Sequence, residues 1–259
     1  MSYDTLKVNV GEDFVAELTL NRPEQLNTFN TPLAEELDAA LKNLDADERV
    51  RVVLLSGAGK AFCAGIDVKE LAGKTATEYR VWIEKMERPL VTISRMAKPV
   101  IAQVHGVAAA NGAGLAVAAD LTIAAQSARL GLTAINVGLN CVGPVVPASK
   151  SLGRKRALEM LLFGELIGAA RALSHGLVNR VVEDDQLAAE ARSWAAALAQ
   201  KSPLAVQNAK QAYYAAENMD YDRAFAFMNE AFARLCTTED AKEGVNAFFE
   251  KRAPQWKIK

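Results

Sequence analysis

The stretch KPVIAQVHGVAAANGAGLAVAAD, from Lys98 to Asp120, carries the pattern that decides the fold. Its first part, KPVIAQVHG, is apolar and predicts a buried strand that ends beside Gly106. Its second part, AAANGAGLAVAAD, predicts a glycine turn followed by a short, wholly apolar helix, and Asp120 is the first charge after that turn. Such a turn aims backbone N–H groups at a bound group, and the helix dipole favours negative charge there.

Strands and helices are expected to alternate around this stretch. Between the first two strands we expect a helix that is capped by Thr31 and has Pro32 at its first position. A later segment, 142–164, is expected to become helical after Pro147. Four further segments are rich in β-branched and apolar residues and predict strands: FVAELTLN (14–21), VRVVLLSG (50–57), DLTIAAQSARLGL (120–132) and GLVNRVV (176–182). The alternation indicates a mixed α/β fold with right-handed strand–helix–strand units.

The composition shifts near Asp184, where Ala-rich amphipathic segments begin. They include DDQLAAEARSWAAALAQ, SPLAVQNAKQAYYAAEN and TTEDAKEGVNAFFEKR, and each predicts a helix. We therefore expect an α/β core over residues 1–184 and a helical region over residues 185–259. The helical region cannot bury all its apolar faces alone, so it is expected to pack on the core or on a partner subunit.

The composition excludes several classes of function. Among 259 residues, 30 Lys and Arg nearly balance 31 Asp and Glu, so neither a nucleic acid nor an anionic membrane is an expected partner. Only two histidines are present and no ligand spacing for zinc occurs, so no metal is expected. Three widely spaced cysteines, no signal-peptide pattern and no bilayer-length apolar run predict a cytoplasmic protein.

The segment KAFCAGIDVKEL, residues 60–71, follows the predicted strand 50–57 directly. Gly65 permits a tight turn after which Ile66 and Asp67 present free N–H groups. A backbone N–H at such a turn can stabilise a developing oxyanion by a few kcal/mol. A plain strand–turn–helix connection with Asp67 as the N-cap is the alternative interpretation.

Two other motifs are less informative. GAGLAV, residues 112–117, superficially matches a dinucleotide-binding fingerprint, but no acidic residue follows about twenty positions later, so dinucleotide binding is not expected. The segment GLTAINVGLNCVGPVVP, residues 131–147, offers only Asn136, Asn140 and Cys141 as functional side chains. A lone cysteine in apolar surroundings is usually buried and inert. Neither histidine lies near Cys141 in sequence, so no catalytic triad is predicted.

Together these segments resemble the crotonase (enoyl-CoA hydratase/isomerase) superfamily. The resemblance rests on LNRPEQLNTFN, AFCAGIDVKEL, KPVIAQVHGVAAANGAGLAVAAD, GLVNRVV and EGVNAFFEKRAPQWK, and it covers nearly the whole chain in order. It implies a ββα-spiral core with a C-terminal helical oligomerisation region, assembled as a homotrimer or homohexamer. It further implies an acyl-CoA substrate, with coenzyme A as part of that substrate and no other cofactor.

Carried over residue by residue, the resemblance assigns oxyanion-hole N–H groups to Ile66 and Asn111. These groups would polarise a thioester carbonyl and stabilise the enolate beside it. Asn111 replaces a glycine of the family, although asparagine tolerates a positive φ better than most residues. The resemblance also implies six contacts with CoA: Leu26, Ala64, Asp67, Val68, Leu71 and, from a neighbouring subunit, Lys251.

Two departures from the family pattern concern its hydratase glutamates. The corresponding positions are Gly114 and Ala134, which cannot exchange a proton, so hydration by the usual two-glutamate route is doubtful. Isomerisation, decarboxylation or another lyase reaction remains compatible with an oxyanion hole. Asn140, Cys141 and Val142 are candidate pocket residues opposite the hole. The side chains that could replace the two glutamates as acid–base groups are Tyr79, Trp82, Glu84, Glu87, Asn140 and Cys141.

Three hypotheses therefore stay open from the sequence. The first is an acyl-CoA thioester enzyme of the hydratase/isomerase type. The second is a non-catalytic or regulatory protein that binds acyl-CoA, motivated by Gly114 and Ala134. The third is a purely structural oligomer without affinity for CoA.

Overall fold

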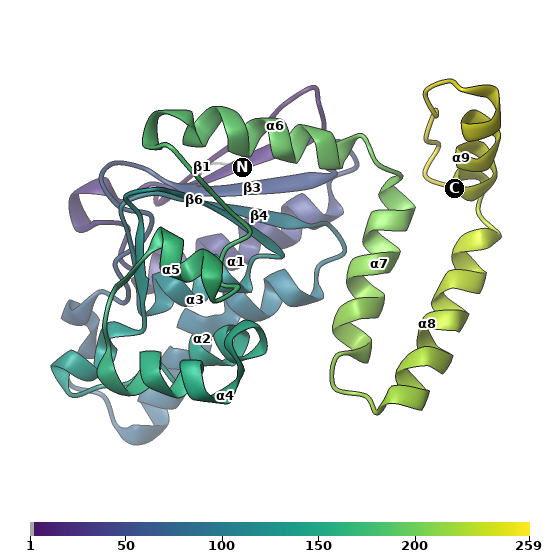
Figure 1. Ribbon diagram of the computed structural model, residues 1–259. Coiled ribbons are helices and arrows are strands. Elements are labelled where there is room, and N and C mark those ends of the chain that lie inside the picture. Colours follow the sequence, from purple (N-terminus) through teal and green to yellow (C-terminus); the bar gives the residue numbers. More distant parts are fainter. Residues whose placement is uncertain (1–2) are drawn as a thin grey trace.

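The computed structural model describes residues 3–259 and shows a mixed α/β body with a helical arm (Figure 1). The main sheet has six strands in the order β1-β2-β3-β4-β6-β9, in which β1 and β2 are antiparallel and all other neighbours are parallel. Its strands are β1 (Leu6–Val10), β2 (Val15–Leu20), β3 (Val52–Gly57), β4 (Val100–Val104), β6 (Leu121–Ala125) and β9 (Arg180–Val182). The central strands are apolar on both faces because helices cover both faces of a parallel sheet.

A second, smaller sheet lies beyond the end of β4. It consists of β5 (Val107–Ala109), β7 (Arg129–Gly131) and β8 (Ile167–Gly168), in the order β5-β7-β8. The chain thus leaves the main sheet at β4, enters the second sheet at β5 and passes at once into the helix α3 (Asn111–Ala118). Every residue of that helix except Val117 is buried, which confirms the predicted buried helix.

Helices cover both faces of the main sheet (Figure 1). The helix α6 (Leu187–Ala199) lies on one face, while α1 (Thr31–Ala46), α2 (Ala76–Arg95) and α3 lie on the other. The helix α4 (Val145–Phe163) and the short α5 (Ala169–Ser174) follow the second sheet. Four short 3-10 helices complete the body: Pro23–Gln25, Val68–Leu71, Thr133–Val137 and Asp184–Gln186.

The last three helices form an arm that extends from the body. Figure 1 shows α7 (Pro203–Ala216) beside the body, with α8 (Tyr221–Cys236) and α9 (Glu239–Glu250) farther out. Large apolar side chains on this arm are exposed: Tyr221, Phe225, Phe232, Val245, Phe248 and Phe249. In contrast, α6 contributes Leu187, Ala191, Ala195 and Ala199 to the core of the body. The predicted division at residue 184 stays a prediction.

The predicted elements are present, with changed boundaries. The strand expected over 176–182 is limited to β9, and the segment 120–132 splits into β6 and β7. The prediction that α4 starts after Pro147 is wrong, because it begins at Val145. The prediction that Thr31 caps α1 is also wrong. Asn30 holds the extended backbone of a cap, and its side chain accepts a hydrogen bond from the backbone N–H of Leu33 at 3.0 Å.

The strands β1, β5 and β8 and the helices α2 and α5 were not predicted from the sequence. The helix α2 begins at a complete capping box, in which Thr75 and Glu78 satisfy each other's backbone N–H groups. No helix among the described residues is long and apolar enough to cross a membrane.

Candidate active site

The site depends on the register between β5 and the chain that follows β3. Cys63 pairs with Ala108 in a parallel bridge: its N–H donates to the carbonyl of Val107 at 3.1 Å, and its carbonyl accepts from Ala109 at 2.9 Å. Three residues further along each segment stand Ile66 and Asn111. The register therefore brings the two predicted oxyanion donors to the same end of this pair of segments.

Both N–H groups lack a partner within the part of the chain that the structure describes. In the bridge between Phe29 and Ile66, the N–H of Phe29 donates to the carbonyl of Gly65 and the N–H of Asp67 donates to the carbonyl of Phe29, each at 2.7 Å. The N–H of Ile66 takes no part in this bridge. Asn111 is the first residue of α3, where backbone N–H groups have no acceptor in the preceding turn. Among the described residues neither N–H has an acceptor. Two free donors thus border one cavity.

Glycines permit the close approach of the two segments. A Cβ built on Gly112 would lie 2.0 Å from the carbonyl oxygen of Cys63, which is far inside van der Waals contact. Gly65 has φ = 109°, and a Cβ there would lie 3.1 Å from the Cβ of Ala110. A side chain at either glycine would push the two N–H donors apart.

The unusual backbone of this turn falls on Ala110, not on Asn111. Ala110 has φ = 48° and ψ = −115°, whereas Asn111 is already helical. The positive φ that the sequence associates with Asn111 therefore occurs at Ala110. A non-glycine residue in such a conformation costs roughly 1–3 kcal/mol. The N–H of Ala110 donates to the carbonyl of Gly131 at 2.8 Å, which helps to hold this turn in place.

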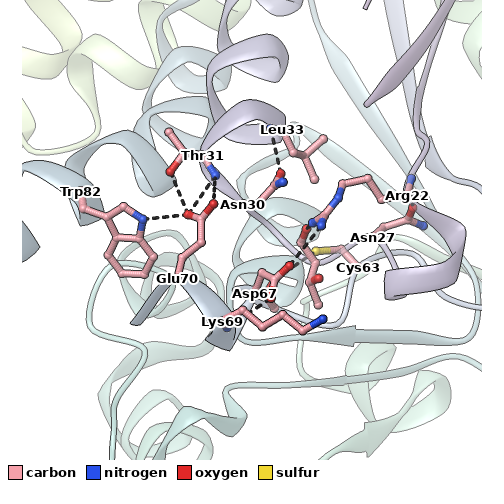
Figure 2. Close-up of polar contacts among 12 residues, drawn as sticks. Arg22, Asn27, Asn30, Thr31, Leu33, Cys63, Asp67, Lys69, Glu70 and Trp82 are labelled. Carbon is pink, nitrogen blue, oxygen red and sulfur yellow. Dashed lines mark hydrogen bonds and ion pairs between the residues drawn. The ribbon is translucent and has the colours of Figure 1, made fainter. Parts of the chain in front are cut away.

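A polar network fixes the loop that carries Ile66 (Figure 2). Arg22 pairs with the Asp67 carboxylate at 3.0 Å, and Asp67 also accepts from the backbone N–H of Lys69 at 3.2 Å. Burial alone would raise the pKa of Asp67, but the hydrogen bonds from Arg22 and Lys69 outweigh it and lower the pKa. Asp67 is the N-cap of the 3-10 helix Val68–Leu71. This agrees with the alternative interpretation of the segment as a strand–turn–helix connection capped by Asp67.

Glu70 ties the same 3-10 helix to two long helices (Figure 2). Its carboxylate accepts from the backbone N–H of Thr31 in α1 and from Nε1 of Trp82 in α2, both at 3.0 Å. Burial raises the pKa of Glu70, and these hydrogen bonds together lower it below its usual range. The turn at Ile66 is therefore anchored on both sides by ionised carboxylates.

The cavity in front of the two N–H groups has a volume of about 900 Å³. Apolar side chains dominate its lining, and among the described residues Arg80 and Glu87 are the only charged ones that line it. Eight of the predicted site residues line it: Ile66, Asn111, Ala64, Val68, Leu71, Asn140, Cys141 and Val142. Ala134 lines it as well.

Three other predicted residues lie outside this lining. Leu26 is on the adjacent turn, and its carbonyl accepts from Ala64 at 3.0 Å. Asp67 faces Arg22. Lys251 is the C-cap of α9 on the arm and does not line the cavity. The predicted contacts of these residues with CoA stay predictions.

Gly114 is enclosed by packing rather than facing the cavity. A Cβ built there would lie 2.7 Å from the Cβ of Pro144 and 3.1 Å from a methyl group of Leu90. Pro144 lines the cavity and fills the space into which a side chain at position 114 would point. A carboxylate could not be accommodated at Gly114 without moving Pro144.

Most of the candidate replacement groups already have structural partners. The Tyr79 hydroxyl donates to the carbonyl of Leu71, and Trp82 donates to Glu70. Glu84 pairs with Arg80 at 2.9 Å and does not line the cavity. Burial raises the pKa of the Cys141 thiol, which disfavours a thiolate nucleophile.

Glu87 differs from these groups. Its carboxylate has no hydrogen bond or ion pair with any described residue, and burial raises its pKa. The helix α2 was not predicted from the sequence as a wall of the cavity. The signal was present, because Ala76, Arg80, Ile83 and Glu87 recur at helical spacing after a capping box.

Comparisons with known proteins identify the family and the fold. The profile of a family described as enoyl-CoA hydratase/isomerase matches residues 11–259. The chain is 36% identical over 258 residues to (E)-benzylidenesuccinyl-CoA hydratase of Thauera aromatica, with 98% of each protein covered. The crystal structure of an enoyl-CoA hydratase from Mycobacterium smegmatis has a TM-score of 0.94 and 39% identity, covering 97% of this chain and 98% of that one.

Human enoyl-CoA hydratase domain-containing protein 3 is a third similar protein. Its crystal structure has a TM-score of 0.93 and 29% identity, and the match covers 97% of this chain and 100% of that one. The fold is therefore the crotonase fold that the sequence predicts. This chain belongs to the enoyl-CoA hydratase/isomerase family of the crotonase superfamily.

Proposed function

We propose that this protein is an acyl-CoA-processing enzyme that polarises a thioester carbonyl between the N–H groups of Ile66 and Asn111. The supporting observation is the register of Cys63 with Ala108, which brings two unpartnered backbone donors to one cavity. Family membership supports the substrate class, because the similar proteins named above are CoA-thioester hydratases or their relatives.

The proposed chemistry is enolate stabilisation. The thioester oxygen accepts hydrogen bonds from both N–H groups, and it gains negative charge when a bond to the neighbouring carbon breaks. Fixed donors then stabilise the transition state more than the ground state, and each is worth roughly 10²–10³ in rate. The N-terminal end of α3 adds the favourable end of a helix dipole. Backbone donors and one proton carrier suffice for this chemistry, so coenzyme A enters only as part of the substrate.

The reaction class follows from the groups that could move a proton. Hydration by two glutamates is not proposed, since Ala134 has no acidic group and Pro144 fills the space beside Gly114. We infer an isomerase or lyase reaction, with decarboxylation as one form, in which the electron pair passes through the enolate. The apolar lining of the cavity suits a hydrocarbon acyl chain.

The arm supports a homo-oligomeric assembly. Phe248 and Phe249 in α9 are 78% and 76% exposed, and a single chain leaves them uncovered. A second copy of this chain would bury these rings, and we propose a homotrimer or a homohexamer. In that assembly Lys251 would reach the CoA phosphates of a neighbouring subunit, while Leu26, Ala64 and Asp67 would border CoA within the same chain.

The test compares two ligands that differ only at the carbonyl. Hexanoyl-CoA carries the thioester oxygen, whereas the thioether S-hexyl-CoA lacks it. Two hydrogen bonds of about 0.5–1.5 kcal/mol each predict that hexanoyl-CoA binds roughly 5- to 150-fold more tightly in titration calorimetry. Equal affinities would contradict the oxyanion hole, and no binding of either ligand would contradict the CoA site.

A second function, acyl-CoA binding without turnover, is favoured by one observation. Pro144 occupies the space where position 114 could have presented an acid. This candidate predicts the same preference for hexanoyl-CoA, but no conversion of any enoyl-, malonyl-type or β-ketoacyl-CoA. Product formation from a single member of such a panel would exclude it.

A further inference from the structure

We propose that Glu87 is the proton-transfer residue of this site, acting from α2 on the carbon next to a thioester carbonyl held by Ile66 and Asn111. This inference rests on the proposed thioester site and adds the group that the oxyanion hole needs. Glu87 is the one carboxylate in the lining of the cavity among the described residues. The other charged lining group, Arg80, is a guanidinium and cannot take up a proton.

The first argument is the freedom of this carboxylate. Asp67 and Glu70 near the site are held by Arg22, Thr31 and Trp82, so they are structural anions. Glu87 has no such partner among the described residues, although it is half-buried. A carboxylate that loses solvent without gaining a partner destabilises the fold, and such groups are concentrated at functional sites. Burial also raises its pKa above that of a free glutamate, which makes the carboxylate a stronger base.

The second argument is how the surroundings accommodate it. A Cβ built on Gly143 would lie 1.7 Å from Oε1 and 2.0 Å from Cδ of Glu87, so a larger residue at position 143 would displace this carboxylate from its place. The next residue, Pro144, closes the space beside Gly114. Gly143 thus leaves space for the carboxylate of Glu87 from α2, whereas Pro144 leaves no space for a carboxylate at position 114 in α3.

The third argument is the link between α2 and the oxyanion turn. The Asn111 side chain donates through Nδ2 to the carbonyl of Met86 at 3.4 Å. Met86 immediately precedes Glu87, so this contact holds the backbone of Glu87 against the turn that supplies one N–H donor. Base and donor therefore share one rigid junction of two helices.

The proposed step conserves atoms and electrons. The Glu87 carboxylate takes a proton from carbon 2 of the acyl group, and the C–H electron pair forms the enolate whose charge rests on the thioester oxygen. In a 3-enoyl thioester, protonated Glu87 returns the proton to carbon 4 while the carbonyl re-forms and the double bond moves to carbon 2. One carboxylate serves both halves, and no water, oxidant or reductant is consumed.

The experiment follows 3-hexenoyl-CoA in D₂O with the full-length protein. Proton NMR records loss of the carbon 2 hydrogens, and near-ultraviolet absorbance records the conjugated product. Replacement Glu87→Gln is expected to slow both about 10²- to 10⁴-fold without weakening hexanoyl-CoA binding. Glu78→Gln is the matched control, because it makes the same change in the same helix, and glutamine also serves a capping box.

Two further variants separate a catalytic role from a structural one. Glu87→Asp keeps the carboxylate and is expected to retain partial activity. Gly143→Ala keeps Glu87 but displaces its carboxylate, and is expected to slow exchange. Glu87→Gln should melt at the same temperature as the wild type or higher, since it removes an unpartnered charge. A purely structural Glu87 would instead lower the melting temperature.

Each remaining outcome has a definite meaning. Unchanged exchange in Glu87→Gln would overturn the role of Glu87 while the enolate chemistry stands. Binding of hexanoyl-CoA by the wild type without any exchange would also overturn it, and the thioester site would survive. Absence of binding would remove the proposed function itself, and this inference with it.

Discussion

Replacement of Gly112 by alanine tests the geometry of the site most directly. Alanine in place of glycine normally stabilises a helix by up to about 1 kcal/mol. At Gly112 the added Cβ would lie 2.0 Å from the Cys63 carbonyl oxygen, about 1 Å closer than any real contact. The segments must separate, which strains the 2.9 Å hydrogen bond from Ala109 to Cys63.

The magnitude follows from these two effects. Overpacking costs about 1–3 kcal/mol, and the weakened hydrogen bond adds about 0.5–1.5 kcal/mol. We therefore expect Gly112→Ala to lower the free energy of unfolding by roughly 1.5–4.5 kcal/mol. Separation of the segments moves Asn111 away from Ile66, so loss of one donor should reduce turnover roughly 10²- to 10³-fold.

The assay combines urea denaturation with proton exchange of 3-hexenoyl-CoA. Gly168→Ala is the control, because a Cβ there meets nothing within 4 Å and its φ is −73°. That variant should retain its stability and turnover. If Gly112→Ala is as stable and as active as the control, then close approach of the two segments does not set the geometry of the hole.

Three further outcomes are expected. Gly114→Glu should destabilise the protein by about 1–3 kcal/mol, because Pro144 blocks the new side chain. For the same reason the double variant Gly114→Glu, Ala134→Glu should not hydrate crotonyl-CoA. Hydration by the double variant would show that Pro144 does not block this space. Asp67→Asn should lower the free energy of unfolding at pH 7 by about 1–3 kcal/mol. The pKa of Asp67 is lower in the folded than in the unfolded protein, so its stabilising contribution is complete above the unfolded pKa of about 3.9 and is lost as the pH falls through the folded pKa. The free energies of unfolding of the wild type and Asp67→Asn should therefore converge below about pH 4. A difference between them that does not change with pH would refute this. Replacing Phe248 and Phe249 by serine should shift sedimentation toward the monomer, whereas an unchanged sedimentation coefficient would place the subunit interface elsewhere.

The strands and the two glycine turns were predictable because they depend on short-range patterns. Runs of β-branched residues predicted β2, β3, β4 and β6 within a few residues. AAANGAGLAVAAD predicted a buried helix that starts at a turn, and α3 begins at Asn111. The N-cap of α1 was less predictable, since both asparagine and threonine are good N-cap residues. Which of Asn30 and Thr31 caps the helix depends on the hydrogen bond from the Thr31 N–H to the Glu70 carboxylate, a contact between distant residues.

The sequence by itself predicted the family, the alternating fold and the two proposed backbone donors, because glycine turns at strand ends and the motifs of the family leave a local signature. Only the tertiary structure decided which side chains face those donors. Gly114 meets Pro144, and Glu87 meets Gly143, through contacts between residues up to 56 positions apart. Such contacts are set by strand register and helix packing, which no local pattern encodes. The absence of a carboxylate at Gly114 was visible in the sequence, which offered Glu87 as one of several replacement groups. The fold showed that, among the described residues, Glu87 is the carboxylate that lines the cavity without a partner.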